Sequence, residues 1–372
     1  MAEPVTHLAY ALTLHRATAP NLTTNACWSP FSVASALGLV AQGARGLTRD
    51  ELAVLLVGEK SGDLAELGAL LTRAGVLEQH RDNEDEPVIA VANTLWADES
   101  IDVYASYVDE LGRWSSGMVR EAPFRENPPR TRDMINVDVA KTTRDLIPEL
   151  LPPDAIQADT VSALVNALYL KCAWKQRFAE GATASRPFHT PGGAKDVPTM
   201  ELSERIGYAA TDGWQVVSLA AVGGVEAVVL LPDAELATEE PELDAERLAR
   251  LLDAPRHQQV RLWLPKVDVR MQAELSPPLN EVGVRTVFSR DADLGGITAS
   301  ELAVQAVLHE SVLKLDEQGL EGAAATAVMM RLMSLPTGEP VEVHVDRPFL
   351  LVVRHRETGV VYFLARVVDP AE

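Results

Sequence analysis

The chain has 372 residues, of which 47% are hydrophobic and 23% charged, and its formal net charge at neutral pH is −21. This composition is typical of a globular protein with enough apolar residues for a large core. The negative charge argues against binding to nucleic acid or to an anionic membrane surface, because both need a basic face.

The N-terminal residues M-A-E-P-V-T-H-L-A-Y-A-L predict an amphipathic helix. They lack the basic start and the long apolar run of a signal peptide, and no later stretch is apolar enough for a transmembrane helix. We therefore expect a cytoplasmic protein. Arginine far outnumbers lysine and alanine is abundant, which is typical of a GC-rich bacterial gene.

Helices are predicted throughout the first half of the chain. Ser29 is a candidate N-cap, and Pro30 suits the first helical position after it. Thr48 followed by Glu51 is a capping-box pattern, which predicts the start of the next helix. Further helices are predicted at residues 63–77, 104–114 and 131–151, and an acidic surface loop at residues 80–86.

Strands dominate the second half. Residues 160–170, T-V-S-A-L-V-N-A-L-Y-L, are apolar and β-prone, as expected for a central buried strand. Other strands are predicted at residues 88–96, 215–219, 225–231, 259–265, 307–316 and 341–345, with a closing hairpin of 350–353 and 360–367. Helices followed by strands indicate an α+β fold. Because no long linker interrupts the chain, we expect residues 1–372 to form a single domain.

Residues with the spacing of a catalytic or metal site are missing from the sequence. It has no phosphate-binding glycine loop, no G-x-S-x-G elbow and no H-E-x-x-H pair, so we expect no enzymatic activity, no cofactor and no metal. Cys27 and Cys172 cannot form a disulfide framework, and their apolar surroundings predict two buried thiols.

One segment, E-Q-G-L-E-G-A-A-A-T-A-V-M-M-R-L-M-S-L-P at residues 317–336, fits no ordinary element. It is too apolar for a loop and has no helical stripe. In an extended chain every second residue from Leu320 to Met330 is uncharged, which is the period-two pattern of a strand buried on one face. Yet strand candidates already lie on both sides of it. A connection that can also become a strand indicates a bistable segment.

Further segments along the chain have a characteristic order. They are N-A-C-W-S-P-F-S at residues 25–32, V-N-A-L-Y-L-K-C-A-W at 165–174, L-W-L-P-K at 262–266, G-V-R-T-V-F-S at 283–289, A-D-L-G-G-I at 292–297, H-E-S-V-L-K-L-D-E-Q-G at 309–319 and D-R-P-F-L at 346–350. In this order they resemble segments of the serpins, the serine protease inhibitors, over essentially the whole chain. The resemblance implies a fold of three β-sheets and eight to nine helices, with an exposed, mobile reactive-centre loop at about residues 317–340.

The resemblance also implies a function, that of a suicide inhibitor of a serine protease. The protease would cleave the loop, form a covalent acyl-enzyme and be trapped as the loop inserts into the large sheet. In inhibitory serpins a hinge glutamate, here Glu317, usually lies sixteen residues before the cleaved bond, which is then Met333–Ser334. Methionine suits the apolar pocket of elastase-, chymotrypsin- or subtilisin-like proteases. A shift of one residue gives Leu332, and a shift of two gives Arg331 and a trypsin-like target.

The resemblance implies a loop hinge of small residues that can slip between strands. It consists of Glu317, Gly319, Leu320, Glu321, Gly322, Ala323, Ala324, Ala325 and Thr326. Leu320 departs from the family pattern, which usually has threonine or another small residue there, and Gly322 replaces the usual alanine. We expect the bulk of Leu320 to slow insertion and to raise the fraction of inhibitor that is cleaved as a plain substrate.

Further site residues carry over by the resemblance. Ser29, Ser32, Asn166 and His309 correspond to a polar cluster beneath the strands that open, and Trp174 lies where the loop would insert.

The expected partner is a serine protease, bound covalently to a monomeric inhibitor. Because residues 63–86 are acidic on balance, we expect no activation by heparin-type polyanions. The resemblance leaves an extracellular location open. The alternative function is that of a non-inhibitory serpin-fold binding protein or a passive substrate.

Overall fold

The computed structural model describes residues 3–79, 86–111, 117–157, 159–320 and 339–370. Its architecture is α+β, as predicted. The helices are α1 (Glu3–Thr18), α2 (Pro30–Gly43), α3 (Gly46–Val57), α4 (Leu64–Ala74), α5 (Ala105–Leu111), α6 (Pro128–Thr142), α7 (Leu236–Glu239), α8 (Ala245–Asp253) and α9 (Ser276–Glu281).

The strands form two hydrogen-bonded sheets. In spatial order, the first contains β10 (Val267–Glu274), β11 (Val307–Leu315), β12 (Gly319–Leu320), β4 (Ser162–Ala173), β2 (Val88–Asp98) and β3 (Gly117–Ala122). The second contains β1 (Ala26–Trp28), β15 (Val361–Val367), β14 (Phe349–His355), β8 (Val225–Pro232), β7 (Trp214–Ala220), β6 (Gly193–Thr211), β9 (Arg256–Pro265) and β13 (Val341–His344), and β5 (Ala184–Thr190) pairs with β6. Because β6 runs through both halves of the second sheet, the three sheets implied by the resemblance are hydrogen-bonded as two.

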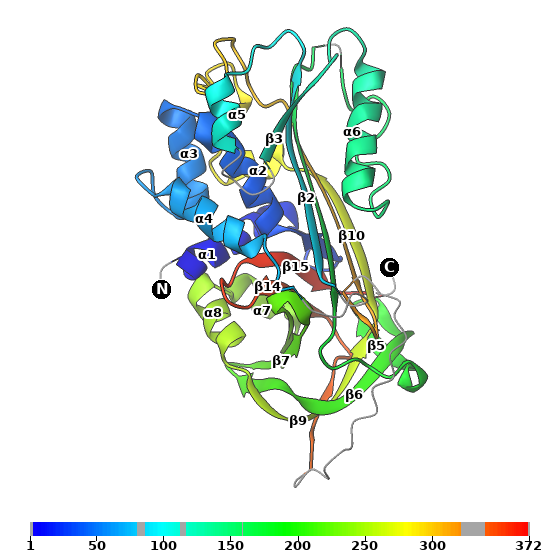
Figure 1. Cartoon of the computed structure of the whole chain (residues 1–372). Coiled ribbons are helices and arrows are strands. Elements are labelled where there is room, and N and C mark those ends of the chain that lie inside the picture. Colours follow the sequence, from blue (N-terminus) through cyan, green and yellow to red (C-terminus); the bar gives the residue numbers. More distant parts are fainter. Residues whose placement is uncertain (1–2, 80–85, 112–116, 158, 321–338, 371–372) are drawn as a thin grey trace.

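Helices cover both faces of the first sheet. The helices α2 to α5 lie on one side of it and α6 on the other (Figure 1). A large core joins α1–α4 to the second sheet and to the inner face of the first. A smaller core beneath α6 contains Trp96, Phe124, Ile135, Val165 and Val312. Strand β4 is therefore buried on both faces, which explains its continuous apolar sequence.

Most predicted elements are confirmed. The Oγ of Ser29 accepts a hydrogen bond from the backbone N–H of Ser32 at 3.1 Å, and Pro30 begins α2. The predicted strands correspond to β2, β4, β7, β8, β9, β11 and β13, and the closing hairpin to β14 and β15. Both cysteines are free and buried, and burial raises the pKa of the Cys27 thiol to about 12.

The predicted capping box at Thr48 and Glu51 is wrong. Helix α3 begins earlier, at Gly46, and its N-cap residue Arg45 makes no side-chain capping bond. The two polar side chains instead bind a distant segment. Thr48 Oγ1 accepts a hydrogen bond from the backbone N–H of Asp293 at 2.9 Å, and the Glu51 carboxylate accepts the backbone N–H of Thr286 at 2.7 Å. Both side chains of the pattern therefore make tertiary contacts and do not cap the helix.

The predicted helix at residues 131–151 is correct only in its first half. Helix α6 begins at Pro128, capped by Asn127, and ends at Thr142. Arg144 and Asp145 have φ angles of 51° and 61°. A right-handed α-helix needs negative φ angles, so the helix cannot extend through these two residues. The acidic loop predicted at 80–86 lies outside the described residues except for Glu86, as do the last residues of the predicted helix at 104–114.

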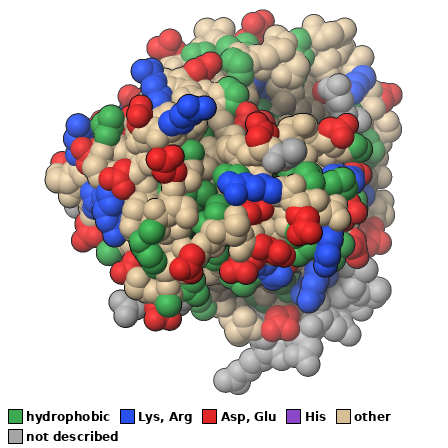
Figure 2. All heavy atoms as spheres, turned by 90° about the horizontal axis from the view of Figure 1, so that it is seen from above, with side chains coloured by type: hydrophobic (Ala, Val, Ile, Leu, Met, Phe, Trp, Pro, Cys, Tyr) green, Lys and Arg blue, Asp and Glu red, His purple; other side chains and the backbone are tan. Residues whose placement is uncertain are grey.

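The surface agrees with the strong negative charge. On the face at the top of Figure 1, Lys and Arg side chains are scattered among Asp and Glu and form no continuous basic patch (Figure 2). In the described part of the chain, no helix is both long enough and apolar enough to cross a membrane.

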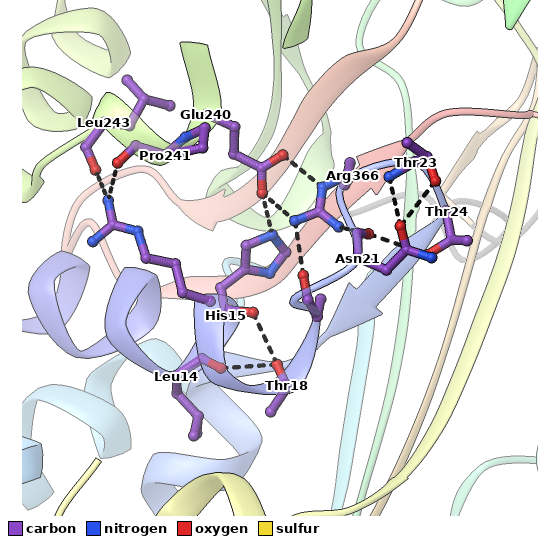
Figure 3. Close-up of polar contacts among 12 residues, drawn as sticks. Leu14, His15, Thr18, Asn21, Thr23, Thr24, Glu240, Pro241, Leu243 and Arg366 are labelled. Atoms are coloured by element: carbon purple, nitrogen blue, oxygen red, sulfur yellow. Dashed lines mark hydrogen bonds and ion pairs between the residues drawn. The ribbon is translucent and has the colours of Figure 1, made fainter. Parts of the chain in front are cut away.

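A buried ionic cluster fastens α1 to the second sheet (Figure 3). The guanidinium of Arg366 is fully buried and donates from Nε to Glu240 Oε2 at 2.5 Å and from Nη1 to the Asn21 carbonyl at 2.8 Å. His15 Nε2 donates to Glu240 Oε1 at 3.0 Å. Burial raises the pKa of Glu240, but the hydrogen bonds from His15 and Arg366 outweigh it and hold the pKa below its usual value. The carboxylate thus stays charged beside Arg366.

We expect Glu240→Gln to lower the free energy of unfolding by about 3–5 kcal/mol, because it leaves the buried Arg366 charge without a counter-charge. The measurement is urea unfolding at neutral pH. Glu242→Gln, at an exposed position of the same segment, is the matched control. Equal unfolding midpoints for the two variants would contradict the prediction.

Candidate functional site

Strands β4 and β11 of the first sheet are hydrogen-bonded to each other at one end and are separated by β12 at the other, which we call the open end. These parallel strands pair over four positions, from Leu164 with Val307 to Ala167 with Glu310. We call this paired stretch the seam. Further along, β12 lies between the two strands and is antiparallel to both, with Leu320 opposite Cys172 and Leu315. Within the described residues, no register joins residues 168–171 of β4 directly to 311–314 of β11.

The open end is held by a tight turn before β12. The Oδ1 of Asp316 accepts hydrogen bonds from the backbone N–H groups of Gln318 at 2.8 Å and Gly319 at 3.2 Å. Trp174 binds the same turn twice, from its backbone N–H to the Gln318 carbonyl at 2.9 Å and from Nε1 to the Asp316 carbonyl at 2.8 Å. A Cβ at position 319 would lie 2.2 Å from the Cys172 carbonyl oxygen, so only glycine fits there.

The predicted hinge glutamate is an anchor in this structure. Glu317 is buried, and its two carboxylate oxygens bind Thr183 Oγ1 at 2.6 Å and Lys266 Nζ at 2.7 Å. Burial raises the pKa of Glu317, but the bonds from Lys266 and Thr183 outweigh it and keep the pKa below its usual value. Glu317 therefore stays ionised and ties the hinge to the corner between β9 and β10.

Leu320 is already buried between β4 and β11, with 1% of its surface exposed. Its bulk is accommodated in the intact chain, which weakens the reason for expecting a slow insertion at this residue. The other predicted loop residues lie outside the described residues. They are Glu321, Gly322, Ala323, Ala324, Ala325 and Thr326 of the hinge, and Met333 and Ser334 of the reactive bond.

The structure brings Ser29, Ser32, Asn166 and His309 together beneath the seam. His309 Nδ1 donates to Asn166 Oδ1 at 3.0 Å, and its Nε2 accepts the backbone N–H of Ser29 at 3.2 Å. These partners require a neutral imidazole with its proton on Nδ1. Asn166 Nδ2 donates to the Ser32 carbonyl at 2.7 Å. The N-terminus of α2 is thus hydrogen-bonded to both strands of the seam.

A fifth member, Asn93 of β2, was not predicted. Its Oδ1 accepts a hydrogen bond from Asn166 Nδ2, and the two residues face each other in the β2–β4 register. The signal was an amide within the apolar run V-I-A-V-A-N-T-L-W. A buried polar residue in such a run needs a partner, which indicates a polar neighbour on the adjacent strand.

The outer face of the seam is crossed by a segment that we call the strap, residues 144–151, which follows α6. At its start, the Arg144 guanidinium lies over the Tyr169 ring of β4, 5.2 Å from the ring centroid. Further along, the carbonyl oxygens of Leu146 and Leu150 accept hydrogen bonds from Arg270 at 3.4 Å and from Gln272 at 2.6 Å. Both donors lie on β10, so the strap reaches from β4 across β11 to β10.

Apolar contacts hold the strap down. Ile147, Leu150 and Leu151 are buried in the smaller core together with Val165 of β4 and Val312 of β11. Leu151 also exchanges hydrogen bonds with the Asn136 side chain of α6, at 2.8 and 3.0 Å. Separation of β4 from β11 would have to disturb these contacts.

The site thus combines a short direct ladder between β4 and β11, a two-residue strand between them, and a buried polar cluster beneath. In the described part of the chain, no group of three or more His, Cys, Asp and Glu residues could hold a metal ion.

Comparisons with known proteins agree with this geometry. The chain matches the family described as Serpin (serine protease inhibitor) over residues 6–370. Iripin-2 of Ixodes ricinus is 31% identical over 364 residues, which cover 96% of this chain and 91% of the relative. Iripin-8 of the same species is 32% identical over 359 residues, with 93% and 88% covered.

The fold is also shared with solved structures. Thyroxine-binding globulin in complex with thyroxine has a TM-score of 0.87 and 22% identity, over 99% of both chains. Uncleaved ovalbumin has a TM-score of 0.84 and 21% identity, over 98% of this chain and 99% of its own.

The buried imidazole predicts a loss of stability in acid. Burial lowers the pKa of His309 to about 3, from 6.5 in the unfolded chain. As the pH falls below 6.5, the unfolded state binds a proton before the folded state does, so the free energy of unfolding decreases until about pH 3. At about pH 5 this one residue should cost about 2 kcal/mol relative to pH 7.5.

His309→Gln should therefore show a weaker pH dependence of urea unfolding than the wild type, although it is less stable at neutral pH. His257→Gln, at an exposed position, is the control and should keep the wild-type dependence. An unchanged pH dependence in His309→Gln would show that other groups are responsible, such as His7, whose pKa burial lowers to about 4.

Proposed function

The chain belongs to the serpin family, and from this premise we propose that it inhibits a serine protease as a suicide substrate. The family supports protease inhibition in general. The covalent trap, the reactive bond and the class of target are our proposal for this chain.

The proposed reaction begins at the loop. The serine Oγ of the protease attacks the carbonyl carbon of Met333, the bond to the Ser334 nitrogen breaks, and the Ser334 amine leaves with a proton from the protease. Met333 remains as an ester on the protease serine. Insertion of the residues before Met333 between β4 and β11 then carries the protease to the far end of the sheet before water can hydrolyse the ester.

The observation that supports this proposal most is the position of β12. Gly319 and Leu320 already occupy the open end of the line between β4 and β11, antiparallel to both strands. An inserted loop would extend the same two ladders. Insertion would therefore continue an existing strand and need not begin a new one.

Continuing these registers leads to the polar cluster. Leu320 faces Cys172 and Leu315, so a residue six positions later would face positions 166 and 309. That residue is Thr326, and its neighbours would be Asn166 and His309. Its hydroxyl could accept from His309 Nδ1 and donate to Asn166 Oδ1, which replaces the hydrogen bond that the two residues lose when the seam opens.

The energetics favour insertion. About fourteen inserted residues at roughly 3.3 Å each span roughly 46 Å, enough to cross the sheet. If a strand paired on both sides gains about two dozen hydrogen bonds at about 1 kcal/mol net each, the gain is on the order of 20 kcal/mol before entropy costs. Before the entropy of ordering the loop is subtracted, this gain is comparable with the whole stability of an ordinary domain.

The proposed target has an apolar primary pocket, because Met333 would fill it. Elastase-, chymotrypsin- and subtilisin-like proteases have pockets of this kind. The register of the bond decides this choice, since a bond after Leu332 keeps the same class and a bond after Arg331 requires a trypsin-like pocket with a buried aspartate.

The alternative is a non-inhibitory binding protein or a passive substrate. The fold by itself does not exclude it, because a thyroxine complex has the same fold. The small residues between Gly322 and Ala327 and the docked hinge at Leu320 favour the inhibitor.

The test is to mix the protein with elastase, chymotrypsin and subtilisin at near-equimolar ratios, follow the products on a denaturing gel and locate the cut by mass spectrometry. A covalent complex with cleavage after Met333 is the expected result. Cleavage without a complex by all three, together with an unchanged melting temperature of the cleaved protein, would establish the passive substrate. A raised melting temperature without a complex would mean that the loop inserts too slowly to trap these proteases.

Thr326→Val should impair insertion of the cleaved loop. Valine keeps the shape of threonine but lacks the hydroxyl, so His309 and Asn166 would lose a partner in the inserted state at a cost of about 1–3 kcal/mol. We expect a higher stoichiometry of inhibition and a lower melting temperature of the cleaved form. Thr326→Ser, which keeps the hydroxyl, is the control. If cleaved Thr326→Val melts like cleaved wild type, the proposed register is incorrect.

Gln272→Ala should loosen the seam, because it removes the hydrogen bond to the strap carbonyl of Leu150. A loss of about 1 kcal/mol corresponds to roughly fivefold faster opening. The measurement is amide hydrogen exchange of residues 164–167 and 307–310, which needs no protease. Gln258→Ala on β9 is the control. Exchange at the wild-type rate in Gln272→Ala would show that the strap does not restrain the seam.

A further inference from the structure

A cleft of about 260 Å³ lies between the second sheet and the connection from α8 to β9, away from the seam. Strands β6, β7, β8 and β14 supply its floor, and Pro255 and Arg256 supply part of its rim. Gly207 lines the cleft, and a Cβ there would lie 3.0 Å from the Ser218 Cβ and 3.2 Å from the Pro255 Cβ, so a larger residue would crowd the cleft. It has room for roughly nine water molecules, which is the size of a small metabolite.

Three arginines line this cleft, although the protein is strongly acidic. One of them is neutralised within the fold. Arg354 donates from Nε to Glu226 Oε1 at 2.8 Å, and Ser218 Oγ donates to the other Glu226 oxygen at 2.8 Å. Arg354 also donates to the Leu252 carbonyl at 2.9 Å. This pair therefore forms a fixed, uncharged wall.

The other two arginines have hydrogen-bonding capacity to spare. Arg256 is held by one nitrogen, Nη1, which donates to the carbonyls of Asp253, Ala254 and Pro255 at 2.7, 3.2 and 3.0 Å. Its Nε and Nη2 donate to no group among the described residues. The side chain of Arg356 makes no hydrogen bond or ion pair in the described part of the chain, while its backbone N–H is fixed to the Gly224 carbonyl at 2.8 Å.

Further donors complete the lining. His257 and Gln176 face the cleft with side chains that have no hydrogen-bond partner among the described residues. Apart from Glu226, the only acidic residue that lines the cleft in this part of the chain is Asp253, whose side chain is 76% exposed and lies 3.4 Å from Arg354. The charged groups without a partner are thus two guanidinium cations, and the Gln176 amide and the His257 ring can add further N–H donors.

We propose that the cleft binds a small anion with two or more charged oxygens, a phosphate or a compact polycarboxylate. Guanidinium groups recognise such oxyanions by paired, charge-assisted hydrogen bonds, and Arg256 and Arg356 would supply them. The proposal does not depend on protease inhibition. A bound anion would join the end of α8 to the end of β14 and would stabilise the folded protein by mass action.

The test is calorimetric titration of the full-length protein with inorganic phosphate, pyrophosphate and citrate at constant ionic strength, with melting temperatures measured in parallel. We expect saturable binding of at least one probe, and the preferred probe separates a phosphate site from a carboxylate site. Arg256→Gln and Arg356→Gln should each weaken binding at least about tenfold. Arg130→Gln, exposed at the start of α6, should bind like the wild type.

Arg356→Gln keeps the test decisive even if Arg256→Gln destabilises the end of α8, because the Arg356 side chain has no hydrogen bond or ion pair to lose among the described residues. The proposal is overturned if none of the three probes binds the wild type, or if the double variant binds with wild-type affinity. It is also overturned if sodium chloride at the same ionic strength raises the melting temperature equally.

Discussion

The central constraint in this molecule is the short ladder between β4 and β11. The two strands are paired directly over four positions, and β12 holds them apart at the other end. Among the described residues, β4 and β11 are therefore paired directly in one half of the sheet and only through the two residues of β12 in the other. The hinge anchor at Glu317, the polar cluster at His309 and the strap over Val312 all lie along this line. Whether β4 and β11 can separate therefore depends on the strength of these four residue pairs and of the contacts around them.

The two faces of the seam are closed by different kinds of interaction. On the inner face, His309 and Asn166 make directional hydrogen bonds in full burial, so they cannot separate without replacement partners. On the outer face, the strap is held by apolar side chains and by hydrogen bonds through its own carbonyl groups. Both faces thus oppose separation of β4 from β11, and the polar groups of the inner face would in addition favour one register of an inserted strand.

Local sequence signals predicted much of this architecture and missed what depends on distant contacts. The N-cap at Ser29 and the buried strand β4 were predictable, because neighbouring residues determine them. The end of α6 was not predictable, because Arg144 adopts a left-handed backbone conformation that an arginine in the sequence does not indicate. Strand β6 was not predicted, because it is half exposed and its polar residues hide the apolar pattern of a buried strand. The strap was not predicted either, because its backbone carbonyl groups bind β10, and backbone groups leave no signal in the sequence. The resemblance supplied the cluster residues, except Asn93.

The position of β13, β14 and β15 has a consequence for what cleavage would release. All three strands follow the proposed reactive bond, yet β14 lies between β8 and β15 in the second sheet and β13 pairs with β9. Phe349, Leu351 and Phe363 are fully or almost fully buried there. A cut after Met333 would therefore break the covalent chain, but the two fragments would stay associated in one folded protein. The two pieces would migrate together in gel filtration and would separate only in denaturant, as a permanently nicked protein whose smaller piece serves as part of the framework.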